Sequence, residues 1–182
     1  GYMFAIKNGG PLTKEIIKKM DLTSLGPTDK YVINTRITMC MKGQYPSIPG
    51  WHGDNVPRSE QYSQPDFSKV DINTRHALCI LSSTENHSNT QFLDQVLQVH
   101  YDPANVWGSV DKFINGYNDT LGARTSYVKE GQIVGFSQLD MHRATEVKTP
   151  GWRLFFRISN SGKINDEIRN QVQVYTPLGM GW

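Results

Sequence analysis

The sequence of 182 residues has little of what marks membrane, nucleic-acid-binding or secreted proteins. No apolar run approaches the roughly 20 residues that a membrane-spanning helix needs. The net charge is only +2, and Lys and Arg form no cluster beyond pairs such as Lys18 and Lys19, so neither a membrane nor nucleic acid is expected as a partner. The only two cysteines, Cys40 and Cys79, lie within apolar runs and are expected to be buried free thiols. We therefore expect a cytoplasmic protein.

The chain also lacks internal repeats, low-complexity tracts and breaks in composition that would mark a linker. Its length suffices to build one core without disulfides. We therefore expect a single domain over residues 1–182, with its core at about 31–177 and a helical insertion at about 92–127.

Patterns of apolar residues predict more strand than helix. Alternation or short apolar runs predict strands at residues 31–41, 76–83, 131–142, 152–159 and 170–177. Helical spacing predicts one helix over 12–20, with Thr13 as its N-cap, and another over 109–118, with Ser109 as its N-cap. Because Gly, Pro and Asn turns separate the strands without regular strand–helix alternation, we expect a sandwich or barrel rather than a parallel sheet.

Two metal-binding side chains stand two positions apart in the segment WHGD at residues 51–54. In an extended strand, residues i and i+2 point to the same side, so His52 and Asp54 can converge on one ion, and Gly53 adds no side chain between them. One imidazole and one carboxylate are too few for a tight site, so a third ligand should come from elsewhere. His142 is the best candidate, whereas the other histidines are interpreted as ordinary polar residues: His76, His87 and His100.

The segment that follows His142 places two arginines in an otherwise apolar strand. The apolar strand WRLFFRIS at 152–159 contains Arg153 and Arg157, which alternation assigns to the same face. A buried guanidinium group needs an anionic partner, because an unpaired buried charge is costly. The planar fork of arginine is suited to holding a carboxylate through two hydrogen bonds.

Two histidines and one carboxylate on one side of a metal form the facial triad of non-haem Fe(II) oxygenases. The sequence resembles the Fe(II)/2-oxoglutarate-dependent dioxygenases, whose H-x-D…H…R pattern reads here as WHGD at 51–54, LDMHRATE at 139–146 and GWRLFFRIS at 151–159. The resemblance spans about residues 48–159. It implies a mainly β fold with flanking helices, namely a distorted double-stranded β-helix, which is a cupin-like jelly roll.

The resemblance also implies the metal, the cosubstrates and the reaction. His52, Asp54 and His142 would hold Fe(II), and the cosubstrates would be 2-oxoglutarate and O2. Oxidative decarboxylation of 2-oxoglutarate would be coupled to hydroxylation, or a related oxidation, of a small-molecule substrate. Asp54 favours these reactions over halogenation, because its carboxylate fills the coordination position that halogenases of the family leave open for chloride.

Two arginines compete for the distal carboxylate of 2-oxoglutarate under the same resemblance. Arg153 follows His142 by eleven residues (153 − 142), a spacing like that of the taurine dioxygenase and phytanoyl-CoA hydroxylase groups. Arg157 lies in an R-x-S segment like that of other branches. We favour Arg153 and expect Arg157 to reach the substrate or to assist. Thr90, in NTQFL at 89–93, is similar to a threonine that these enzymes have after the first metal strand, and is expected to help bind the cosubstrate.

Other interpretations remain open. A cupin-like metal-dependent isomerase or epimerase would use Asp54 or a nearby residue as a base, and a variant of that site would pair His87 with His52. A non-enzymatic β-sandwich module would carry the His, Asp and Arg pattern by chance. Arg58 and Arg143 flank the ligand segments and either contact the substrate or are solvated. The sequence leaves the substrate and the oligomeric state open.

Overall fold

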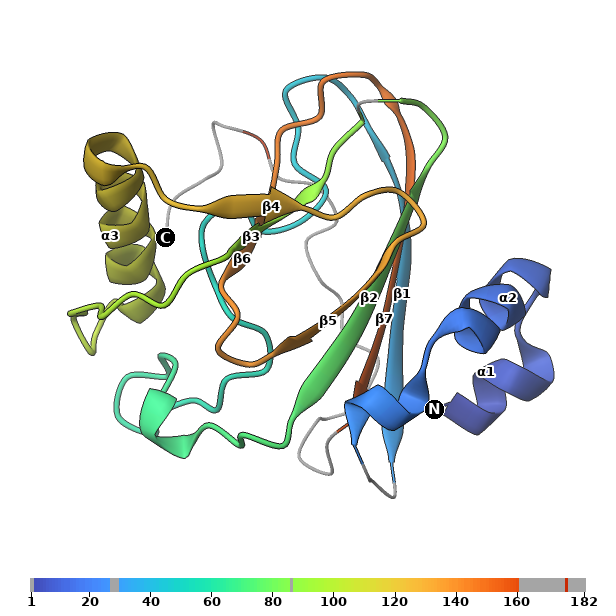
Figure 1. Cartoon of the computed structure of the whole chain (residues 1–182), viewed down its shortest axis with the longest axis horizontal. Coiled ribbons are helices and arrows are strands. Elements are labelled where there is room, and N and C mark those ends of the chain that lie inside the picture. The colour runs from blue at the N-terminus through green and yellow to red at the C-terminus, as the bar shows by residue number, and fades with distance from the viewer. Residues whose placement is uncertain (1, 27–29, 86, 161–175, 177–182) are drawn as a thin grey trace.

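The computed structural model describes residues 2–26, 30–85, 87–160 and 176, and these residues form a mainly β structure with two antiparallel sheets (Figure 1). The larger sheet has the strand order β1-β7-β2-β5, with β1 (Tyr31–Cys40), β7 (Gly151–Asn160), β2 (Arg75–Ser82) and β5 (Ile133–Ser137). The smaller sheet has the order β4-β3-β6, with β4 (Thr125–Tyr127), β3 (Thr90–Leu93) and β6 (His142–Ala144). A single bridge from His52 to His142 adds a further extended segment beside β6.

Three α-helices among the described residues flank these sheets. They are α1 (Tyr2–Asn8), α2 (Pro11–Lys19) and α3 (Val106–Leu121), and two short 3-10 turns, η1 (Leu22–Leu25) and η2 (Phe67–Lys69), accompany them. In Figure 1, α1 and α2 lie beside the larger sheet, whereas α3 lies beyond the smaller sheet on the other side of the molecule. None of the three is long and apolar enough to cross a membrane.

Helix α2 covers the outer face of the larger sheet. Ile16, Ile17 and Met20 are buried, as the helical spacing predicts, and they share a core cluster with Cys79, Phe156 and other residues of β2 and β7. The helix starts from Gly10 with Pro11 at its first position, which suits proline because the first helical N–H has no partner within the helix. The prediction that Thr13 is the N-cap is therefore wrong.

The inner face of the larger sheet is polar where β7 crosses it. Alternation along β7 turns Phe156 and Ile158 outward into the α2 cluster and turns Arg153 and Arg157 to the opposite face, where both are buried. On the neighbouring β1, Thr38 is buried while Ile37 is 66% exposed. Neither arginine therefore faces solvent.

Three sequence-based expectations about elements are wrong. The segment 131–142 is two strands, because Asp140 closes a turn by accepting hydrogen bonds from the backbone N (2.6 Å) and Oγ (2.8 Å) of Ser137. The insertion at 92–127 is helical only over α3, since β3 ends inside it and β4 lies within it. Asn105, not Ser109, is the N-cap of α3, and the Ser109 hydroxyl instead accepts from the backbone N of Asp102 at 3.1 Å.

Three further expectations have different outcomes. Cys40 and Cys79 are buried free thiols, which confirms that expectation. The expected strand at 170–177 lies outside the described residues, except for Thr176, which is exposed and has no regular structure. The expectation of a single domain over residues 1–182 stays a prediction.

Candidate metal centre

His52 and His142 come from adjacent extended segments of the smaller sheet. The backbone N of His52 donates to O of His142 at 3.1 Å, and the backbone N of His142 donates to O of His52 at 2.9 Å. Direct partners in an antiparallel pair project their side chains to the same face. The two imidazole centroids accordingly lie 4.7 Å apart.

Both imidazoles have the same tautomer. Nδ1 of His52 lies 2.8 Å from O of Gly50, and Nδ1 of His142 lies 2.9 Å from O of Asp140. Because a carbonyl oxygen can only accept, each Nδ1 must carry the proton and donate it. With Nδ1 engaged in this way, Nε2 is the nitrogen of each ring that remains to bind a metal ion.

Asp54 completes a group of three potential ligands. Its Oδ2 lies 3.5 Å from Nε2 of His142 and also forms an ion pair with Nη1 of Arg157. One ligand atom from each of His52, Asp54 and His142 lies within 4.8 Å of the other two. The three side chains that the sequence singles out thus meet at one point, with two nitrogen donors and one oxygen donor.

A close backbone approach explains the glycine between the first two of these residues. A Cβ at position 53 would collide with the carbonyl O of Gln138, and it would lie 3.4 Å from side-chain atoms of Met141 and Val56. Gln138 also ties the two segments together, because its Nε2 donates to O of Asn55 at 2.5 Å. Gly53 therefore lets the segment 52–54 lie directly against the chain that leads into His142.

The electrostatics of the centre favour metal-binding protonation states. Burial, and next the neighbouring His142, lower the pKa of His52 to about 4, so this imidazole is neutral at pH 7. Burial alone would raise the pKa of Asp54, but Arg157 and then His142 outweigh it and hold that pKa well below its usual range. A neutral imidazole and a carboxylate therefore face each other without any proton having to leave at neutral pH.

Arg153 lies deeper between the sheets and has a different environment from Arg157. Only 2% of its surface is exposed, and its Nη2 donates to Oγ1 of Thr90 at 3.2 Å. Burial, and then the nearby Arg36, lower its pKa to about 10, so it remains charged at neutral pH. Within the described part of the chain, Nε of Arg153 has no hydrogen-bond partner, and no carboxylate forms an ion pair with this guanidinium.

Hydrogen bonds from α3 and β3 hold the residues next to His52 and His142 in place. Trp51 directly precedes His52, and Arg143 directly follows His142. The Arg143 guanidinium lies 4.5 Å from the centroid of the Trp51 ring. Oδ1 of Asn115, on α3, accepts from Nε1 of Trp51 at 3.2 Å and from Nη1 of Arg143 at 3.0 Å. Asp111 accepts from the backbone N of Trp51 at 2.7 Å, and Gln91 accepts from Nε of Arg143 at 2.8 Å.

The sequence does not reveal this support. Trp51 is buried, and Arg143 is bonded to β3 and α3 rather than solvated or directed at a substrate. One usable signal exists, since Trp51 and Arg143 each adjoin a ligand and must point to the opposite face. Asn115 gives no signal, because its two partners come from distant parts of the chain.

The remaining candidates do not belong to this group of three ligands. His76 is fully buried with Nδ1 2.7 Å from Oγ of Ser159, and His87 has its Nδ1 2.9 Å from O of Thr149. The group of ligand atoms around His52 does not include His87, so the variant that pairs these two histidines is not supported. His100 is exposed, and the exposed Arg58 bonds to O of Ser63 in its own loop.

Comparison with known proteins gives distant structural similarity only. No family model and no curated protein matches the chain. Two crystal structures of an N-substituted L-amino acid dioxygenase from Burkholderia ambifaria AMMD, one of them in complex with alpha-KG, are similar in part, each with a TM-score of 0.41 and 11% identity. The match covers 69% of this chain and 47% of theirs, so the chain spans about half the length of these proteins.

Proposed function

We propose that this chain is a non-haem Fe(II) oxygenase that couples oxidative decarboxylation of 2-oxoglutarate to hydroxylation of a small molecule. The observation that carries the proposal is the combination of a His-Asp-His group with a buried arginine that no carboxylate of the described residues neutralises. The triad supplies the ligand set of such an iron site, and the arginine supplies a place for a dicarboxylate.

The strand order supports a double-stranded β-helix, or jelly roll, as the fold. With the His52 segment counted beside β6, one sheet reads β1-β7-β2-β5 and the other reads His52 segment-β6-β3-β4. Along the chain, most connections cross from one sheet to the other, as they do in a jelly roll. In this arrangement His52, Asp54 and His142 would lie between the sheets at one end.

The donor set fits Fe(II). Two imidazole nitrogens and one carboxylate oxygen match the 2-His-1-carboxylate triad, and Nε2 is the nitrogen of each ring that would bind the metal because Nδ1 is engaged. When bound, the iron would supply the activation of O2 that no amino-acid side chain provides. Arg157 would orient the Asp54 carboxylate, and its charge would keep that carboxylate ionised.

Arg153 fits the distal carboxylate of 2-oxoglutarate better than Arg157 does. Arg157 already has an acidic partner in Asp54, whereas the hydrogen-bond partner of Arg153 among the described residues is the neutral hydroxyl of Thr90. A carboxylate beside Arg153 would offset the cost of burying that charge. Thr90 would then hold the guanidinium in position, since its hydroxyl accepts from Nη2.

The overall reaction balances without any other reductant. 2-Oxoglutarate, O2 and a C–H substrate would give succinate, CO2 and the hydroxylated product, with one oxygen atom of O2 in succinate and the other in the product. The protein's part would be to fix both cosubstrate ends and to orient Asp54 through Arg157.

The isomerase alternative needs a base, and Asp54 is poorly suited to that role. Its ion pair with Arg157 holds its pKa well below the usual range, which makes the carboxylate a weak proton acceptor. The non-enzymatic alternative gives no reason for a buried arginine that lacks a carboxylate partner within the part of the chain that the structure describes.

Anaerobic titration with Fe(II) and 2-oxoglutarate tests the proposal directly. We expect a weak visible charge-transfer band that requires both components, followed by succinate release when air is admitted. Asp54→Ala should abolish the band and the succinate, and Asp119→Ala, which removes an exposed carboxylate of α3, should change neither. Iron binding without the band, or turnover of a substrate without succinate, would favour the isomerase alternative.

A further inference from the structure

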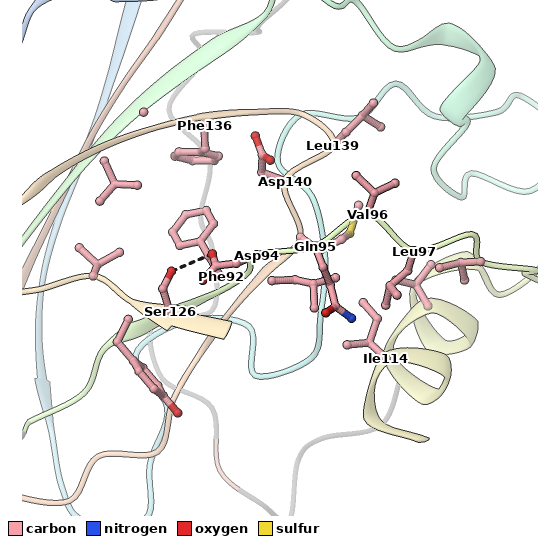
Figure 2. A pocket seen from close by; sticks show the side chains of 18 of the residues that line it. Phe92, Asp94, Gln95, Val96, Leu97, Ile114, Ser126, Phe136, Leu139 and Asp140 are labelled. Carbon is pink, nitrogen blue, oxygen red and sulfur yellow. Dashed lines mark hydrogen bonds between the residues drawn. The ribbon is translucent and has the colours of Figure 1, made fainter. Parts of the chain in front are cut away.

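A cavity of about 960 Å³ lies between the free edges of the two sheets and α3 (Figure 2). β5 and β4 are the end strands of their sheets, and residues of both line the cavity together with Val110 and Ile114 of α3. In Figure 2, Phe92 and Phe136 form one side, and Leu97 and Ile114 form the side next to the helix. The volume is in the range of cavities that hold a complete small molecule.

The cavity adjoins the candidate metal centre. The rings of Phe92 and Phe136 line the cavity, and each also has its centroid 5.1 Å from that of the His142 imidazole. Met141, which directly precedes His142, forms another part of the wall. A ligand in the cavity would therefore rest on the same rings that pack against a proposed iron ligand.

The charged side chains of the cavity wall, Asp94, Lys129 and Asp140, are all exposed. Its acidic side chains already accept hydrogen bonds, Asp94 from Oγ of Ser126 at 2.9 Å and Asp140 from Oγ of Ser137 at 2.8 Å. Gln95 differs, because its Oε1 accepts from the backbone N of Arg124 at 3.1 Å while its Nε2 is buried with no partner in the described part of the chain.

An unpartnered buried donor in an apolar cavity indicates what a ligand should bring. An oxygen that accepts from Nε2 of Gln95 would remove the cost of leaving that N–H unsatisfied. At this Nε2 a cationic head group would gain nothing, because the group offers it only N–H hydrogens. The rest of the wall is mainly apolar and favours an aliphatic or aromatic body over a sugar or a nucleotide.

We propose that this cavity binds the substrate of the oxygenase, and that the substrate is a mainly apolar small molecule with one carbonyl or carboxylate oxygen. Its apolar end lies against Phe92 and Phe136, and its oxygen accepts from Gln95. The inference rests on the proposed function, which supplies the oxidation. The C–H bond that is hydroxylated belongs to the apolar end, where one oxygen atom of O2 is inserted and the other enters succinate.

Three probes with one body and different head groups test the chemistry of the cavity. 4-Phenylbutyrate, 4-phenylbutanamide and 4-phenylbutylamine are titrated calorimetrically into protein loaded with Mn(II) and 2-oxoglutarate. We expect the acid, the amide or both to bind at least about tenfold more tightly than the amine, as one hydrogen bond to a buried donor allows. The comparison of acid with amide tells a carboxylate substrate from a carbonyl substrate.

A charge-changing variant of one residue provides the decisive comparison. Gln95→Glu keeps the oxygen that accepts from Arg124 N but replaces the free donor with a second acceptor, so binding of the acid and the amide should weaken by about tenfold. Gln98→Glu is the matched control, since Gln98 is exposed and does not line the cavity. Equal binding of all three probes, or no effect of Gln95→Glu, would overturn the inference.

Paramagnetic broadening then locates the probe. Mn(II) should broaden the NMR signals of the phenyl protons more than those next to the head group, relative to a Zn(II)-loaded sample. Selective broadening of the head-group protons would overturn the proposed orientation. If the charge-transfer band forms but no probe binds, this inference fails alone. If probes bind through Gln95 but neither band nor succinate appears, the proposed function fails and the cavity is not an oxygenase substrate site.

Discussion

His52 and His142 are direct partners across two strands, and each donates its backbone N–H to the carbonyl of the other. The distance between their rings is therefore set by sheet geometry rather than by side-chain packing alone. Asp54 joins them because it lies two residues after His52 in the same extended segment. A centre built in this way depends on backbone pairing, and several predictions concern how that pairing is maintained.

Removing the carboxylate of Asp54 should have two separable effects. Asp54→Ala should abolish Fe(II)-dependent succinate release, because two imidazoles alone leave the triad incomplete. It should also destabilise the metal-free protein by about 3 kcal/mol, since it leaves the buried Arg157 without its partner. Urea unfolding of Asp54→Ala and of Asp54→Ala/Arg157→Met should show recovery in the double variant, where the unpaired charge is gone. Equal stability of the two variants would contradict the ion-pair assignment.

The two arginines of β7 should differ in their effect on 2-oxoglutarate. Arg153→Gln should raise the KM for 2-oxoglutarate by about 10- to 100-fold, the range expected for losing hydrogen bonds to a charged group. Arg157→Gln should instead weaken iron binding, because Arg157 orients Asp54. Steady-state assays with varied 2-oxoglutarate and Mn(II) titrations measure the two effects. A raised KM in Arg157→Gln alone would reverse the assignment.

Acid should destabilise the protein through His76. Burial, and then nearby Arg157, lower the pKa of His76 to about 3, whereas the unfolded chain protonates this residue near pH 6.5. The unfolded state therefore binds more protons between these values, and stability falls as the pH falls. The loss should be about 1.4 kcal/mol per pH unit, or about 3 kcal/mol at pH 4.

A variant separates this effect from other acid-sensitive groups. His76→Gln can still bond to Ser159 but does not titrate, so its free energy of unfolding should fall less steeply between pH 6 and pH 4 than that of the wild type. Urea unfolding of both metal-free proteins measures the difference in slope. Parallel pH profiles would show that His76 protonates in the folded state.

Asn115 should act on the centre without touching it. Asn115→Leu removes the oxygen that links Trp51 to Arg143, so the His52 and His142 strands should hold a metal less tightly. We expect the dissociation constant for Mn(II) to rise about tenfold, as for other partners behind metal ligands. Asp119→Leu, at an exposed position of the same helix, is the control and should leave binding unchanged. Equal weakening in both variants would show that the effect is not specific to the bonds of Asn115.

Two glycine substitutions should have opposite signs. Gly53→Ala should destabilise the protein and weaken metal binding, because the new Cβ would collide with the carbonyl of Gln138. Gly116→Ala lies in α3, where a Cβ meets no neighbouring atom, and should stabilise by about 0.5–1 kcal/mol. Thermal unfolding of the two variants beside the wild type checks both signs.

Local patterns in the sequence account for much of the centre. The convergence of His52 and Asp54 follows from their spacing of two, and the shared face of Arg153 and Arg157 follows from alternation in a strand. Burial of Ile16, Ile17 and Met20 follows in the same way from helical spacing. Each of these features depends on residues that are close together in the chain.

Features that depend on distant residues could not be predicted. The segment 131–142 alternates well enough to suggest one strand, and only the bonds of Asp140 to Ser137 show that it turns. The segment after β3 is apolar enough to suggest a helix, yet its side chains line a cavity together with α3. The partners of Asn115 come from two strands that are far apart in the sequence, so no local pattern identifies it.

Helix α3 offers two neighbouring faces to the rest of the molecule, and this has a consequence for evolution. Val110 and Ile114 line the cavity, while Asp111 and Asn115, one position further along, bond to Trp51 and Arg143. Substitutions on the first face can reshape the cavity while the second face keeps the histidine strands in place. Mutations can thus change which ligand the cavity binds without disrupting the His-Asp-His centre.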